Sequence, residues 1–220
     1  MKNETQRYWE IDFLRGIAVI MMIAYHIFFD LDFLGIISIP LDHPAFRLFL
    51  YPIGTLFLML VGFSLVLSYQ RYHSQNGVNP PVEKYLKRSV SLFSIALLIT
   101  GLTWLYPHDG FIVFGVIHCI SLSILITYFF IEKPMISLVT GLIIVGIGLF
   151  FSTMYISNPY LFWMGIKTSS FHTLDYFPLF PWLGVVLIGV YMPGAPSWSA
   201  KSSVRAYPTR KSAAKRRSPI

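Results

Sequence analysis

The stretch IDFLRGIAVIMMIAYHIFFDLD, residues 11–32, decides the fold of this chain. It is long and apolar enough to cross a membrane as a helix, yet ionisable side chains interrupt it. Such groups are costly inside a membrane, so they usually face a protein interior and serve a function. Several polar positions recur at steps of three or four and therefore share one stripe of a helix. The stripe comprises Asp12, Arg15, Val19, Met22, His26 and Asp30.

The whole chain has the composition of an integral membrane protein. It is 55% hydrophobic and 12% charged, with a mean hydropathy of +0.63, far from a soluble domain. Apolar segments lie near residues 11–31, 48–69, 89–106, 111–131, 135–155 and 176–192. About 20 helical residues cross the hydrocarbon layer, and only the last segment sits at the lower limit. The runs lack the alternation of a membrane barrel. The sequence predicts an all-α polytopic helical bundle with about six transmembrane helices.

Loop charges predict the orientation, because cytoplasmic loops of membrane proteins carry an excess of Lys and Arg. Fifteen of the 17 basic residues fall at the first helix start, in the loops after the second and fourth spans, and in the tail. The opposite loops hold only Arg47 and Lys167. Both termini are therefore predicted to be cytoplasmic, and we expect a multi-pass membrane protein.

The chain divides at residue 193. Residues 1–192 form the expected membrane domain, whereas residues 193–220 are rich in Ser, Ala, Pro, Lys and Arg and are predicted to be disordered. Two interpretations of this tail stay open. It is either a basic tail held near anionic lipid or the product of a frameshift near Tyr191, since the change falls inside what should be a complete helix.

Several function classes are excluded or disfavoured. The net charge of +7 follows from the charge bias and the tail, and no aromatic-basic module accompanies it, so no nucleic-acid partner is expected. A single cysteine, Cys119, excludes an intramolecular disulfide. The histidines lack the spacing of a zinc site, and no metal is expected. No phosphate-binding glycine loop of the soluble type occurs.

Histidines and carboxylates near the outer face are the candidate catalytic groups. His26 lies roughly 16 Å beyond Arg15 along the first helix, and His118 lies roughly 10 Å inside the fourth span. Imidazoles beside carboxylates can act as general base and acid. We therefore select His26, His118, Asp30 and Asp175 as catalytic candidates. The alternatives are that His118 only bridges helices and that Asp175 only caps the sixth helix.

Arg15 and Asp12 mark the cytoplasmic end of the first helix. One interpretation is an ion pair that anchors the helix at the interface. The other is that Arg15, with Asp12 beside it, holds an anionic ligand that enters from the cytoplasm, such as a phosphate group. Glycines such as Gly62, Gly146 and Gly189 are expected to be helix-packing positions rather than parts of a site.

The spacing from Arg15 to His26, an Arg followed by ten residues and a His, resembles the first-helix signature of the transmembrane acyltransferase superfamily. Three further stretches, IGTLFLMLVGFSLVLSY, FGVIHCISLSILI and DYFPLFPWLGVVLIGV, extend the likeness over roughly residues 8–191. Together they resemble the small prokaryotic relatives of the catalytic domain of heparan-alpha-glucosaminide N-acetyltransferase.

This resemblance implies an enzyme that accepts an acyl group, expected to be acetyl, from cytoplasmic acyl-CoA and passes it to a sugar amine or hydroxyl across the bilayer. It also implies that His26 is the catalytic histidine and Arg15 the basic position of the motif. The alternative is a proton-coupled transporter or permease that uses the His and Asp groups as a relay. A third class is a scaffold in which the histidines only bridge helices. The sequence leaves the acceptor and a homo-oligomeric state open.

Overall fold

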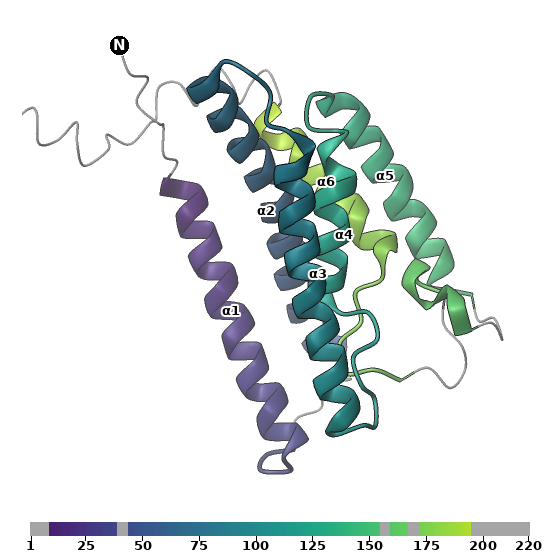
Figure 1. Cartoon of the computed structure of the whole chain (residues 1–220). Coiled ribbons are helices and arrows are strands. Elements are labelled where there is room, and N and C mark those ends of the chain that lie inside the picture. Colours follow the sequence, from purple (N-terminus) through teal and green to yellow (C-terminus); the bar gives the residue numbers. More distant parts are fainter. Residues whose placement is uncertain (1–8, 39–43, 155–158, 167–171, 195–220) are drawn as a thin grey trace, which may run out of the picture.

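The computed structural model describes residues 9–38, 44–154, 159–166 and 172–194, and these residues are mostly helical (Figure 1). The elements are α1 (Trp9–Phe33), α2 (Pro44–Asn76), α3 (Val82–Leu105), α4 (Val116–Tyr128), α5 (Pro134–Phe151), the 3-10 helix η1 (Pro159–Met164) and α6 (Leu179–Gly194). Apart from one isolated bridge, this part of the chain contains no β-structure. The prediction of an all-α fold is confirmed for it. The tail predicted to be disordered lies outside the described residues, apart from its first two positions.

Four of the described helices are long and apolar enough to cross a membrane, namely Trp9–Phe33, Pro52–Asn76, Val82–Leu105 and Pro134–Phe151. The other two are shorter. α4 has 13 residues and α6 has 16, which correspond to about 20 Å and 24 Å of helix. The apolar segments 111–131 and 176–192 are therefore only partly helical. A total of six spans stays a prediction.

α6 lies at the centre of the bundle and packs against α2, α4 and α5 (Figure 1). Glycines make this close approach possible, because a Cβ on Gly62 would collide with the Val186 carbonyl and one on Gly189 with the Met59 carbonyl. Their predicted role in packing is confirmed. The same prediction is wrong for Gly146, which has no neighbouring atom within 4 Å of an added Cβ.

α1 lies at the edge of the bundle and makes its main contacts with α2 (Figure 1). Ile11 and Ala18 are buried in one apolar cluster with Leu60 and Phe63 of α2. The face of α1 opposite the polar stripe, which includes Ile20, is exposed as a lipid-facing surface would be. We call the end of the bundle that holds Asp12 the inner end, after the cytoplasmic side predicted from the loop charges.

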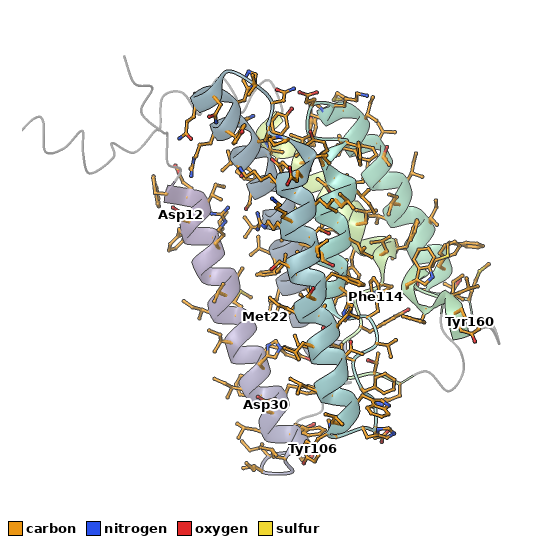
Figure 2. All side chains as sticks on the ribbon, viewed as in Figure 1. Asp12, Met22, Asp30, Tyr106, Phe114 and Tyr160 are labelled. Atoms are coloured by element: carbon orange, nitrogen blue, oxygen red, sulfur yellow. The ribbon has the colours of Figure 1, made fainter. Side chains whose placement is uncertain are left out.

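α4 and α6 are short, and an extended segment precedes each of them inside the bundle. Residues 110–114 run beside residues 173–177, joined by hydrogen bonds from the Leu174 N–H to the Gly110 carbonyl, 2.7 Å, and from the Phe177 N–H to the Phe114 carbonyl, 3.0 Å. Figure 2 places Phe114 well away from the outer end marked by Asp30 and Tyr106. Backbone that is not helical and lies inside the membrane needs hydrogen-bond partners from the protein for its N–H and C=O groups.

Threonines of α3 and of the second extended segment supply several of those partners. The Thr100 hydroxyl donates to the Ile112 carbonyl at 2.7 Å, and the Thr103 hydroxyl accepts a bond from the Ile112 N–H at 3.1 Å. The Thr173 hydroxyl donates to the Phe111 carbonyl at 2.9 Å. These bonds hold the entry to α4 in place inside the bundle, and the candidate site is built around that entry.

Candidate active site

Asp175 occupies the N-terminal end of α4, although it belongs to the segment before α6. Its Oδ2 accepts a hydrogen bond from the Val116 N–H at 2.8 Å. Gly115 is the N-cap residue of α4, and a Cβ there would collide with the Asp175 carboxylate. The carboxylate thus takes the place of an N-cap side chain, where the helix dipole favours a negative charge. The interpretation that Asp175 caps the sixth helix is wrong, because it caps α4.

His26 lies on α1, and within the described part of the chain one of its two ring nitrogens has no hydrogen-bond partner. Its Nδ1 is 2.8 Å from the Met22 carbonyl oxygen, so Nδ1 carries the proton and donates it in this bond. In a neutral ring, Nε2 is then the unprotonated nitrogen and can accept a proton. The ring also packs edge-on against Tyr25, with 5.4 Å between the ring centroids. This geometry suits a general base.

Electrostatic interactions connect α1 to the capped end of α4. The carboxylate of Asp175 interacts electrostatically with His26 and with Tyr25. The outer half of α1 therefore lies within electrostatic range of the carboxylate that caps α4. Of the four predicted catalytic residues, the structure places His118 and Asp175 at the same first turn of α4, and His26 lies within electrostatic range of Asp175.

His118 has a different environment, because both of its ring nitrogens are engaged. Nδ1 accepts from the Gly115 N–H at 3.3 Å, which leaves Nε2 to donate to the Thr100 hydroxyl at 3.4 Å. The ring is buried and lies between Phe93 and Phe114. His118 thus joins α3 to the start of α4, as the helix-bridging alternative expected. A catalytic role for His118 stays a prediction.

Asp30 lies apart from the other candidates. It is exposed near the outer end of α1, as Figure 2 shows. Among the described residues, no interaction joins its carboxylate to His118 or Asp175. A catalytic role for Asp30 also stays a prediction.

Arg15 and Asp12 form the ion pair expected from their spacing, with 3.2 Å between Nη1 and Oδ1. Arg15 also reaches across to α2, where its Nη2 donates to the Ser64 hydroxyl, which in turn donates to the Leu60 carbonyl. The Arg15 side chain is still 43% exposed, and a guanidinium has five N–H donors. It can therefore join α1 to α2 and still bind an anion.

Sequence reasoning did not identify Gly115, Thr100 and Ser64, which hold these groups in place. The signal for Gly115 was its position directly before the helix that carries His118. Ser64 and Thr100 gave no signal, because single hydroxyls on apolar helices are common and their partners come from other helices.

A family model described as heparan-alpha-glucosaminide N-acetyltransferase, catalytic, matches residues 7–216. The chain belongs to this family. The resemblance seen in its first helix is thereby confirmed, and the Arg15 and His26 positions lie within the matched range. No curated protein and no solved structure matches the chain. The family and the apolar helices together identify a membrane protein of the N-acetyltransferase type.

Proposed function

We propose that this protein transfers an acetyl group from cytoplasmic acetyl-CoA to a sugar amine or hydroxyl on the outer side of the membrane. The family match supports the reaction class. The observation that carries the proposal is the placement of His26, whose Nε2 is the unprotonated nitrogen of the neutral ring, within electrostatic reach of the Asp175 carboxylate.

His26 acts as the general base in this proposal. The acceptor nitrogen or oxygen attacks the thioester carbonyl while Nε2 of His26 removes its proton, and the carbon–sulfur bond then breaks. The departing thiolate takes the proton back from the imidazolium and leaves as free CoA. In the covalent alternative, Nε2 of His26 attacks the thioester and the carbon–sulfur bond breaks, which releases the CoA thiolate and leaves an acyl-histidine. The acceptor then attacks this acyl group, the bond from the acyl carbon to Nε2 breaks, and the acceptor's proton passes to the thiolate.

Asp175 stabilises the imidazolium that forms during transfer. A carboxylate near a histidine favours its protonated form, and the hydrogen bond from Val116 fixes where this carboxylate lies. His118 positions the start of α4 through Gly115 and Thr100. Asp30, at the outer end, attracts an acceptor amine in its ammonium form.

Arg15, held by Asp12 and Ser64, contacts the donor from the inner end. Its guanidinium favours phosphate groups because it presents paired N–H donors in one plane. Arg15 and His26 are separated by roughly 16 Å along α1. The donor therefore binds at the inner end of α1, and its acetyl group is transferred near His26, toward the outer end.

A transporter is the competing proposal, because a His and Asp pair inside a helical bundle can also relay protons. The two proposals differ in what they require. An acetyltransferase consumes acetyl-CoA and releases CoA, whereas a transporter moves its substrate unchanged in response to a pH gradient.

The test is directional transfer in proteoliposomes that contain the purified protein. Acetyl-CoA is supplied on the side of the inner end and glucosamine on the other side, and N-acetylglucosamine is measured. We expect product only when both are present, and none from His26→Ala. Proton-driven flux of an unmodified sugar, without any acetylated product, would support the transporter instead.

A further inference from the structure

Tyr25 precedes His26 on α1 and lies beside it. The Tyr25 ring packs edge-on against the His26 ring, with 5.4 Å between the centroids. It also lies 6.1 Å from the ring of Phe29, about one helical turn later. The Tyr25 side chain is half-buried, whereas His26 is exposed. Contacts with both neighbouring rings therefore restrict the position of this phenol beside the proposed general base.

The Tyr25 hydroxyl differs from the hydroxyls of two tyrosines at the inner end. The Tyr69 hydroxyl donates to Glu132 at 2.6 Å, and the Tyr128 hydroxyl donates to the Pro80 carbonyl at 3.1 Å. Each of these two hydroxyls therefore joins separate segments of the bundle. Within the described part of the chain, by contrast, no hydrogen bond involves the Tyr25 hydroxyl. This donor holds no other segment in place, and it is available to a substrate.

Tyr25 also shares an electrostatic neighbour with His26. Both side chains lie within electrostatic range of the Asp175 carboxylate, which the bond from the Val116 N–H holds at the start of α4. Consecutive side chains leave a helix about 100° apart, so the two groups approach this region from different directions. A base and a phenol of α1 are thus both near one fixed carboxylate.

Attack on a thioester creates a negative charge that needs a hydrogen-bond donor. When the acceptor bonds to the carbonyl carbon, an electron pair of the C=O group moves onto its oxygen, and donors aimed at this oxygen contribute strongly to catalysis. At the start of α4, the Gly115 N–H already donates to His118. The next N–H, that of Val116, donates to Asp175. A carboxylate has no proton to donate, so the charge requires another donor near His26.

We propose that the Tyr25 hydroxyl donates a hydrogen bond to the acetyl oxygen during transfer, which makes Tyr25 a further catalytic residue. This inference rests on the proposed function and concerns the same site. A phenol keeps its proton at neutral pH, so it stabilises the oxyanion without transferring the proton. When the carbon–sulfur bond breaks, the C=O double bond forms again. The acceptor's proton passes to His26 and then to the thiolate, and Tyr25 ends the reaction unchanged.

Two simpler roles for this tyrosine do not use its hydroxyl in the reaction. A ring that only packs against His26 needs no hydroxyl, and a tyrosine that only anchors α1 near the membrane surface needs none at the reacting carbonyl. Tyr25→Phe separates these roles from the proposed one, because it keeps the ring and removes the donor.

The experiment measures steady-state acetyl transfer to glucosamine in proteoliposomes of wild type, Tyr25→Phe and Tyr106→Phe. Tyr106 is exposed at the outer end and provides the matched control (Figure 2). We expect Tyr25→Phe to lower kcat about 10²-fold, as the loss of one oxyanion donor does. The KM values for both substrates and the unfolding temperature should not change, because the lost bond forms only in the transition state. Tyr106→Phe should have the wild-type rate.

The pH profile of kcat separates a direct role from one that acts through His26, because its acid limb reports the general base. We expect the same midpoint in wild type and Tyr25→Phe. A shifted midpoint, a lowered unfolding temperature or a wild-type rate in Tyr25→Phe each overturns this inference and leaves the proposed function standing. A well-folded wild-type protein that forms no acetylated product overturns the proposed function as well.

Discussion

The Asp175 carboxylate accepts the Val116 N–H bond at 2.8 Å from a position 59 residues further along the chain. It thereby caps a helix that begins inside the bundle and interacts electrostatically with His26 on a third element. One side chain thus has a structural role, which needs an oxygen atom, and a proposed chemical role, which needs a negative charge. Substitutions can separate the two.

Asp175→Asn keeps an oxygen for Val116 but removes the charge. We expect it to fold with near wild-type stability and to lose acetyl transfer by about 10²-fold or more, the lower range for general base catalysis. Asp175→Ala should also lose about 0.5–2 kcal/mol of stability, as a lost N-cap does. Thermal unfolding in detergent and a transfer assay measure the two effects. Equal destabilisation by both substitutions would contradict the capping role of the oxygen.

Gly115→Ala tests whether the carboxylate needs the space beside the N-cap. An added Cβ would collide with Asp175 and also lie 3.0 Å from a methyl carbon of Ile112, so we expect a loss of about 1–3 kcal/mol. Gly146→Ala is the matched control, because no atom lies within 4 Å of its added Cβ. Unfolding temperatures of the two variants decide the matter. A Gly115→Ala protein as stable as Gly146→Ala would show that Asp175 does not sit against this glycine.

The two candidate histidines should respond differently to substitution. His118→Ala removes a buried ring and leaves the Gly115 N–H and the Thr100 hydroxyl without their partner, so we expect about 2–4 kcal/mol of lost stability. His26→Ala removes an exposed ring and should change stability by about 0.5 kcal/mol or less while abolishing transfer. The check is unfolding temperature and turnover measured on the same preparations. A His118→Ala protein that is as stable as wild type but inactive would instead show that His118 has a catalytic role.

The packing of α6 against α2 depends on glycine at one crossing. Gly189→Ala would force a Cβ against the Met59 carbonyl, and we expect a loss of about 1–3 kcal/mol or failure to assemble. Gly101→Ala on α3, where no atom lies within 4 Å, should be neutral. Size-exclusion profiles and unfolding temperatures compare the two variants. If Gly189→Ala had the same size-exclusion profile and unfolding temperature as Gly101→Ala, α2 and α6 would be further apart than the structure places them.

Much of this arrangement could be predicted from the sequence, because membrane helices depend on local composition. The apolar runs located the long helices, and the spacing of Asp12 and Arg15 predicted their ion pair. Each of these features is encoded within one helix, so no knowledge of the tertiary fold was needed.

The features that could not be predicted depend on contacts between distant segments. Hydropathy does not show that α4 begins at Val116 rather than near Phe111, because the residues between them are equally apolar. The partner of Asp175 is far away in the chain, so a carboxylate near the start of the sixth helix was assigned to the nearest helix. Gly146 was wrongly predicted to be a packing position, because the spacing of glycines along a helix does not tell which of them face a neighbouring helix.

The central claim is that Arg15 captures the donor and His26 performs the transfer. The most direct test compares acetyl-CoA binding and acetyl transfer in wild type, Arg15→Ala and His26→Ala. We predict saturable binding that is lost in Arg15→Ala and retained in His26→Ala, with transfer lost in both. Transfer at the wild-type rate by His26→Ala, or the absence of acetyl-CoA binding by well-folded wild-type protein, would contradict the claim.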